Sequence, residues 1–161
     1  MRASVAVVVL LAFMCAGCFG KKKEEIPPEC IASSSSLLTT CVEEINTATE
    51  FFGVKPDDPS TFENLVINDE LINGLLEELG DPTPGCCKGT CEFVNDYCGC
   101  NKPMIKLIDG FVAGNFQFFR TVSESIGSKC GIPTYYEENC PKNAWEKTWK
   151  KFAPGNCTQF E

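Results

Sequence analysis

The chain has 161 residues, with 14 Lys and Arg against 22 Asp and Glu, for a formal net charge of −8, and it has no histidine. Such an acidic chain lacks the long-range attraction that brings proteins to nucleic acids or anionic lipid surfaces. The lack of histidine removes the commonest general base and the commonest zinc ligand. With no nucleophile–base pattern either, we expect a non-catalytic protein with no cofactor, no metal and no nucleic-acid partner.

Residues 1–20 have the features of a secretory signal peptide. Arg2 precedes an apolar run over 5–14, and small residues follow up to Gly20. The run is shorter than the ~20 residues of a membrane span, so we expect secretion without stable membrane insertion. Removal through Gly20 makes the net charge −9 and leaves ten cysteines, an even number that suits full oxidation. Cleavage before Cys18, as at a bacterial lipoprotein site, is the alternative.

Residues 21–28 are charged and then proline-bearing, which is typical of a flexible lead-in. Proline is tolerated in the first turn of a helix, so a helix is expected to begin at this point. Apolar residues recur near helical spacing as far as Ile45, and Gly53 suits a terminator. The serine run at 33–36 lies inside that periodicity, so we interpret it as helix rather than linker.

The next segment combines a turn with an amphipathic helix. Residues 55–59 form a proline-bearing turn, and Ser60 and Glu63 then have the spacing of a capping box. Two apolar faces follow before Gly80 closes the helix: Phe62, Leu65 and Val66, then Leu71, Ile72, Leu75, Leu76 and Leu79.

Three more helices are expected after Gly80. The first begins at Pro84 and carries one stripe of side chains, Cys87, Cys91, Val94 and Cys98. The second is capped by 101–103 and the third is a long stretch after Gly114. A tail at 141–161 has Trp145, Trp149 and Phe152 at helical spacing. The sequence therefore predicts an all-α protein of five or six short helices braced by disulfides.

Eight cysteines follow the order C, C, CC, CxC, C, C: Cys30, Cys41, Cys86, Cys87, Cys98, Cys100, Cys130 and Cys140. This order in a helical context resembles the eight-cysteine domain of plant lipid-transfer proteins, seed storage 2S albumins and bifunctional amylase/protease inhibitors. The resemblance covers residues 29–140. The chain departs from that family in its acidic charge, in the 44 residues between Cys41 and Cys86, and in two extra cysteines, Cys91 and Cys157.

The resemblance implies a disulfide pairing. Cys41 would pair with Cys86 and Cys87 with Cys130, while Cys30 and Cys140 would each take one of the two cysteines of the CxC motif, in an order left open. We add the inference that the two extra cysteines, Cys91 and Cys157, form a fifth bridge. That bridge would staple the tail at 141–161 to the helix that carries Cys91.

The resemblance also implies a secreted carrier that binds a fatty acid, a lipid or a similar apolar small molecule. Bridges supply stability that a filled core otherwise would, so an apolar cavity becomes possible. Without the resemblance, the phenylalanines of 111–119 would be ordinary core and surface residues. The expected wall residues are Leu65, Leu75, Leu79, Ile105, Ile108, Phe116, Phe119 and Val122.

Alternatives remain open at this stage. The dense cysteines could be metal ligands or, at Cys98 and Cys100, a redox dithiol, although secretion and even parity favour disulfides. The protein could be a protease or amylase inhibitor, or a surface-recognition protein of the same fold, acting on a secreted enzyme through the loop at 53–61. A carrier of the odorant-binding type is the second alternative. Asn156 begins an N-glycosylation acceptor sequence.

Overall fold

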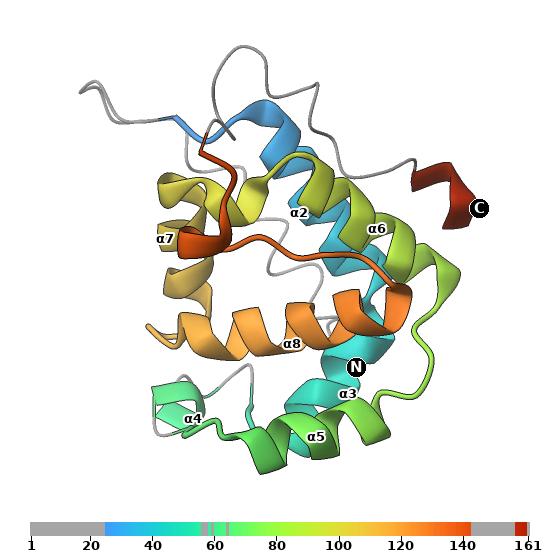
Figure 1. Ribbon diagram of the computed structural model, residues 1–161. Coiled ribbons are helices and arrows are strands. Elements are labelled where there is room, and N and C mark those ends of the chain that lie inside the picture. Colours follow the sequence, from blue (N-terminus) through green and yellow to red (C-terminus); the bar gives the residue numbers. More distant parts are fainter. Residues whose placement is uncertain (1–24, 56–57, 59, 64, 143–156, 161) are drawn as a thin grey trace, which may run out of the picture.

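The structure is a computed structural model that describes residues 25–55, 58, 60–63, 65–142 and 157–160. Within those residues it has seven α-helices, three short 3-10 helices and no strand, which confirms the all-α prediction (Figure 1). The elements are α2 (Pro28–Thr40), α3 (Val42–Phe51), α4 (Ser60–Glu63), α5 (Asp69–Glu78), α6 (Pro84–Asn95), η1 (Cys98–Cys100), α7 (Lys102–Phe111), α8 (Phe116–Cys130), η2 (Glu137–Asn139) and η4 (Cys157–Phe160). None of the described helices is long and apolar enough to cross a membrane. The expected signal peptide lies outside the described residues.

The first expected helix is divided into α2 and α3. Cys41 sits between them with φ −103° and ψ 24°, outside helical values. Just before it, the Thr39 hydroxyl donates to the carbonyls of Ser35 and Ser36, and the Thr40 hydroxyl donates to that of Ser36. Hydroxyls that bond to carbonyls one turn back tend to bend helices. The spacing of apolar residues carries no information about these hydroxyl-to-carbonyl bonds, so it predicted an unbroken helix.

The serine run forms part of α2, as expected, and half of it is buried. The hydroxyls of Ser33 and Ser34 donate to the carbonyls of Glu29 and Cys30 on their own helix. Buried hydroxyls satisfied in this way carry little penalty. The segment at 21–28 was expected to be a flexible lead-in, but Ile26 within it packs against the core.

Helices α2 and α6 lie side by side across the top of the molecule (Figure 1). Their backbones approach closely at Gly89 of α6. A Cβ atom built there would lie 3.1 Å from the Cα of Leu37 and 2.5 Å from the Thr40 hydroxyl oxygen. The sulfur-to-sulfur bridge between Cys41 and Cys86 joins the ends of the same two helices. Glycine is therefore required at this contact.

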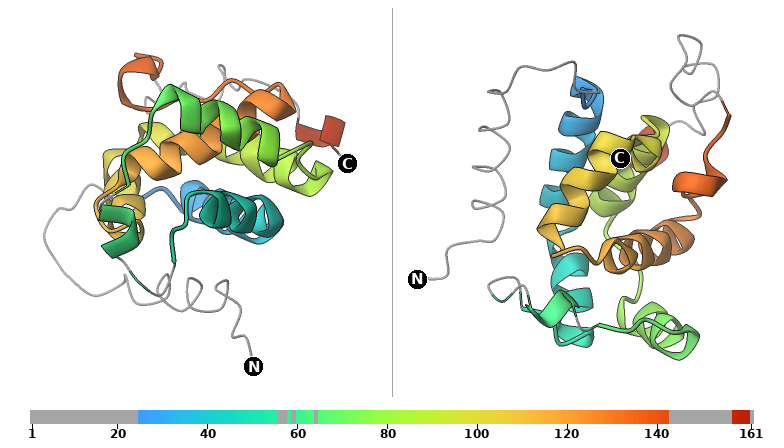
Figure 2. Two further views of the ribbon diagram at one scale, coloured as in Figure 1. Left: turned by 90° about the horizontal axis from the view of Figure 1, so that it is seen from below. Right: turned by 90° about the vertical axis from the view of Figure 1, so that its left-hand side faces the viewer.

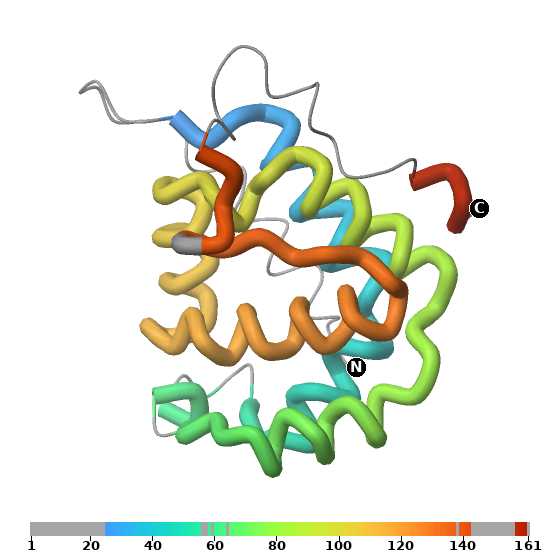
Figure 3. Tube along the Cα trace, viewed as in Figure 1, coloured from blue at the N-terminus to red at the C-terminus, as the bar shows by residue number. Residues whose placement is uncertain are grey.

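Helix α8 runs across the middle of the fold. Helix α5 packs beside both α3 and α8, as the views of Figure 2 show. After α8 the chain turns at Gly131, with φ +68°, and residues 132–140 run back along the other side of α8 (Figure 3). Helix α8 is therefore covered on one side by α5 and on the other by this returning segment.

Five disulfides brace the helices. The structure has Cys41–Cys86, Cys87–Cys130 and Cys91–Cys157, as expected, and it resolves the open choice as Cys30–Cys98 and Cys100–Cys140. A chain with this many bridges belongs in an oxidising compartment. The expected stripe on α6 holds as far as Val94, but Cys98 lies in the separate turn η1 and reaches α2 instead.

Glycine at the centre of the CxC motif allows the turn η1 to pack tightly. A Cβ atom on Gly99 would lie 2.6 Å from two ring atoms of Tyr136 and would also contact the Tyr135 carbonyl oxygen. Tyr136 is 1% exposed, and its hydroxyl shares a 2.6 Å hydrogen bond with that of Ser123. The motif therefore places two bridged cysteines in one tight turn, which a larger residue at position 99 would block.

A second, smaller apolar cluster attaches the end of the chain to α6. Cys157 and Phe160 of η4 pack against buried residues that include Cys91, Val94 and Ile132. This confirms the inferred staple between the tail and α6. The expected helix with Trp145, Trp149 and Phe152 lies outside the described residues.

Candidate ligand-binding site

One wall of the candidate site is α5, an amphipathic helix. Its first turn is capped by Asn68, whose side-chain oxygen accepts from the Leu71 amide at 2.9 Å. Leu75 is fully buried on the side of the core. Gly74 faces Phe51 of α3, and a Cβ atom there would come within 2.9 Å of the Phe51 ring. These contacts fix the rotation of α5 and leave Ile72 and Leu76 partly buried at its edge.

The opposite wall is α8, which is anchored at its start by Asn115. The Asn115 side-chain oxygen accepts from the Phe118 amide at 3.2 Å and caps the helix. Its side-chain NH₂ donates to the carbonyls of Phe62 at 2.7 Å and Leu65 at 3.2 Å. Phe118 in turn packs edge-on against Phe62, with ring centroids 5.3 Å apart. One side chain therefore ties the chain leading into α5 to the start of α8.

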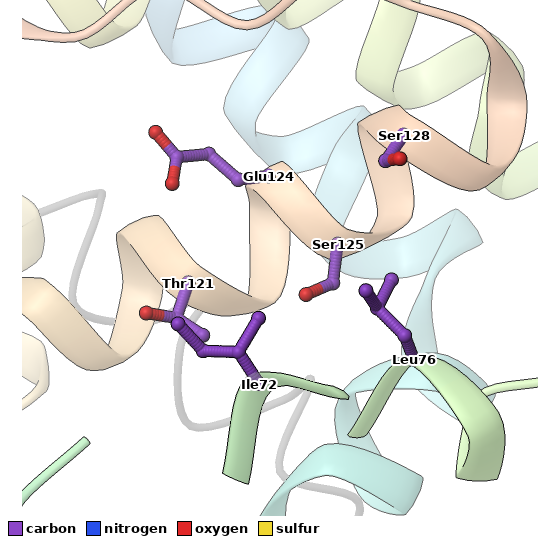
Figure 4. A pocket seen from close by; sticks show the side chains of 6 residues that line it. All are labelled: Ile72, Leu76, Thr121, Glu124, Ser125 and Ser128. Carbon is purple, nitrogen blue, oxygen red and sulfur yellow. The ribbon is translucent and has the colours of Figure 1, made fainter. Parts of the chain in front are cut away.

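A pocket of about 200 Å³ lies between these two helices. Ile72 and Leu76 of α5 supply its apolar side, and Figure 4 shows them facing α8. Across from them the buried Thr121 directs its methyl group toward Ile72, and the Ser125 hydroxyl oxygen points between the two α5 side chains. The complete lining is Ile72, Leu76, Thr121, Glu124, Ser125 and Ser128.

Glu124 is the charged residue of the lining. Its Oε1 accepts from the Arg120 Nε at 2.8 Å, an ion pair one turn apart on α8. Figure 4 shows the carboxylate turned away from α5. Because the pair is partly exposed, it contributes little to stability. The ion pair engages Arg120, which is not part of the lining. None of the six lining residues carries a positive charge.

The eight residues expected to form a cavity wall are distributed through the core. Leu75, Leu79, Ile108 and Val122 are buried, while Leu65, Phe116, Phe119 and Ile105 are partly buried. All except Ile105 belong to, or pack against, one hydrophobic cluster. The pocket between α5 and α8 is lined by other residues, although Leu75 and Val122 lie next to lining residues on the same two helices. The expectation that the eight residues line a cavity remains a prediction.

Sequence reasoning placed Ile72 and Leu76 on an apolar face but did not assign them to a site, and it did not single out the hydroxyl residues of α8. Thr121, Ser125 and Ser128 recur at i, i+4 and i+7, the spacing of one helix face. Polar residues at that spacing are usually interpreted as a solvated surface. In the structure Thr121 is only 2% exposed and Ser125 only 3% exposed, so this face is buried and not solvated.

Phe116 and Phe118, two positions apart on α8, differ in burial. Phe118 is 6% exposed at the centre of the core, while Phe116 is partly buried and stacks on Phe119 at 5.9 Å. Phe119 also contacts Tyr136 edge-on. Burial raises the pKa of Tyr136 far above its usual value, despite the opposing effect of the hydrogen bond to Ser123. Tyr136 therefore remains neutral and acts as a packing residue.

A buried carboxylate lies beside one of the bridges. Glu44 is 5% exposed, and its Oε1 accepts from the Thr83 amide at 2.7 Å, while its Oε2 is buried without a partner among the described residues. The ligand atoms of Glu44, Cys41 and Cys86 lie within 4.8 Å of one another. The two sulfurs are bonded to each other, and a metal requires thiolates. The Glu44 carboxylate is therefore a structural group that holds the start of α6 through the Thr83 amide.

Hydrogen bonds join the described residues of the loop considered for enzyme recognition. The Asp58 amide donates to the Lys55 carbonyl at 2.9 Å. The Thr61 hydroxyl accepts from the Lys55 amide and donates to the Asp58 carbonyl at 2.7 Å. Lys55 and Asp58 are exposed. Asn156, the glycosylation candidate, lies outside the described residues.

Comparison with protein-family models, with curated proteins and with solved structures finds no match to this chain.

Proposed function

We propose that the protein is a secreted, non-catalytic carrier of a lipid or similar apolar small molecule, which it binds between α5 and α8. The observation that carries this proposal is the pocket of about 200 Å³, with an apolar wall from Ile72 and Leu76. Ligand sites in small helical proteins are typically apolar hollows between helices with a few polar groups. Four of the five bridges have the pairing that the resemblance to the eight-cysteine family implies, which supports the same interpretation.

The restraints on α5 differ from those on its neighbours. No cysteine occurs at positions 42–85, so α5 lies within a long segment closed only at its ends by Cys41–Cys86. Helix α8, in contrast, ends at Cys130, which is bridged to α6. Elements held by packing alone open at lower free energy than cross-linked ones. An apolar ligand can therefore widen the pocket by displacing α5 while the bridged helices stay in place.

The expected affinity is modest. Burying a seven-carbon chain gains roughly 5–6 kcal/mol at about 0.8 kcal/mol per CH₂. Association costs at least about 4 kcal/mol of this gain. The remaining ~1–2 kcal/mol corresponds to weak, reversible binding with a Kd of tens of millimolar or higher. Such an affinity suits uptake and release rather than permanent storage.

The test combines native mass spectrometry of the oxidised protein with NMR titration by heptan-1-ol and heptanoate. We expect a bound small molecule or saturable shifts of amides in α5 and α8 with at least one of the two probes. Leu76→Trp should block binding by filling the pocket. Asn73→Trp, on the exposed side of the same helix, should leave it intact. If neither probe causes saturable shifts and no adduct is found, carriage in this pocket is excluded.

A second candidate function is recognition of a secreted enzyme through the loop at 53–61, in which Lys55 and Asp58 are exposed. The hydrogen bonds of Thr61 to Lys55 and Asp58 favour it, because residues held in place in the free protein lose less entropy on binding. Inhibition assays with trypsin and α-amylase distinguish the two functions. Inhibition that is lost in Lys55→Ala supports recognition, whereas binding of heptan-1-ol without inhibition supports carriage.

A further inference from the structure

The pocket between α5 and α8 contains a buried hydroxyl that faces an apolar wall. Ser125 is 3% exposed, and its hydroxyl oxygen points between Ile72 and Leu76 (Figure 4). It makes no hydrogen bond with any residue in the part of the chain that the structure describes, and it is not among the fully buried polar atoms that lack a partner. Ser123 on the same helix shows the contrast, because its hydroxyl contacts both the Arg120 carbonyl and the Tyr136 hydroxyl.

The Ser125 hydroxyl oxygen is therefore open to water in the empty pocket. A ligand that displaces this water must bring its own hydrogen-bonding group to Ser125, because a buried hydroxyl without a partner is unfavourable. The neighbouring Thr121 does not compete for this role, since its methyl group faces Ile72 and its hydroxyl oxygen accepts from the Gln117 side chain at 3.5 Å. Ser125 is therefore the polar anchor of the pocket.

The charges around the pocket select against an anionic ligand. None of the six lining residues is cationic, and Glu124 adds a carboxylate to the lining. The Arg120 guanidinium is engaged by that carboxylate. The whole chain is also acidic, with a net charge of −8. A fatty-acid carboxylate would lose hydration here without gaining a counter-ion, whereas a hydroxyl group is neutral and can both donate and accept.

The pocket is partly open to solvent, and its volume limits how much of a ligand it can enclose. A cavity of ~150 Å³ holds benzene, with its six carbons. By the same proportion, a pocket of about 200 Å³ holds roughly eight non-hydrogen atoms. A hydroxyl at Ser125 leaves the remainder of this volume to an apolar tail against Ile72 and Leu76.

We propose that the pocket between α5 and α8 binds a neutral alcohol with an apolar tail of about seven carbons, anchored by the Ser125 hydroxyl. This ligand class rests on the proposed carrier function and refines it, because it replaces the fatty acid expected from sequence with an uncharged molecule. The alcohol hydroxyl pairs with Ser125, and the tail packs between the two helices.

The experiment compares heptan-1-ol with heptanoate, which have equal chain lengths, by calorimetric titration of the oxidised protein at pH 7. We expect heptan-1-ol to bind at least tenfold more tightly. Ser125→Ala should weaken heptan-1-ol binding three- to tenfold, because it removes the partner of the alcohol hydroxyl. Lys129→Ala, at an exposed position of α8 outside the lining, should leave the affinity unchanged.

The outcomes separate this inference from the carrier function. Heptanoate binding as tight as that of heptan-1-ol, or unchanged alcohol affinity in Ser125→Ala, refutes the hydroxyl anchor while carriage stands. Absence of binding by both probes refutes the carrier function together with the inference.

Discussion

Removing the Cys91–Cys157 bridge tests how firmly the end of the chain is attached to α6. In the presence of the other four bridges, the shortest loop that it closes runs nine positions from Cys91 to Cys100, across the bridge to Cys140, and seventeen positions on to Cys157. A loop of roughly 26 residues corresponds to ~3.5 kcal/mol of unfolded-state entropy. The Asn95 amide also loses a sulfur acceptor at 2.9 Å, which adds up to about 1 kcal/mol.

The double variant Cys91→Ala/Cys157→Ala should therefore lower the free energy of unfolding by about 3–4 kcal/mol. Equilibrium unfolding in urea without reductant, followed by far-UV circular dichroism, measures this value. The matched variant Cys41→Ala/Cys86→Ala opens a loop of similar size, roughly 23 residues through Cys30–Cys98, but both of its cysteines are 0% exposed. It should be more destabilising because it also leaves a void in the core. A loss below about 1 kcal/mol for the first variant would refute the staple.

Three further predictions concern the core. Leu75→Ala should cost about 2–5 kcal/mol, because the side chain is fully buried, while Val66→Ala at 78% exposure should change stability by less than about 0.5 kcal/mol in the same urea assay. Gly99→Ala should destabilise by about 1–3 kcal/mol through its clash with the Tyr136 ring, whereas Gly110→Ala, in open space on α7, should stabilise by about 0.5–1 kcal/mol; a reversed order in thermal melts contradicts the packing described. Burial raises the pKa of Tyr136 above its unfolded-state value. The free energy of unfolding should therefore keep the full contribution of the neutral tyrosine below pH 10, and fall by up to about 1.4 kcal/mol per pH unit above pH 10. Tyr136→Phe should remove this slope from alkaline unfolding curves.

The helix boundaries were predictable where a local residue determines them. Pro84 begins α6, and the Asn101 side chain caps α7 by accepting from the Met104 amide. Local signals failed where distant groups decide the backbone. The break at Cys41 coincides with a bridge to α6, and Val66, expected on an apolar helix face, is 78% exposed in the extended link between α4 and α5.

The candidate site was less predictable than the fold. The apolar residues Ile72 and Leu76 are evident from their spacing, because burial of one helix face repeats every three or four positions. Ser125 gives no such signal, since a serine on a helix is normally solvated. Its burial follows from the packing of α5 against α8, an arrangement that depends on Asn115 holding the chain before α5. Only the assembled fold brings these residues together.

The most direct measurement of the central claim is the position of a bound ligand between α5 and α8. Isotope-filtered NMR of the oxidised protein with heptan-1-ol detects which side chains lie near the ligand. The account predicts nuclear Overhauser effects from the alkyl chain to the methyl groups of Ile72 and Leu76, and from the hydroxyl-bearing carbon to Ser125. Saturable binding with contacts confined to other residues, or no binding at all, would contradict it.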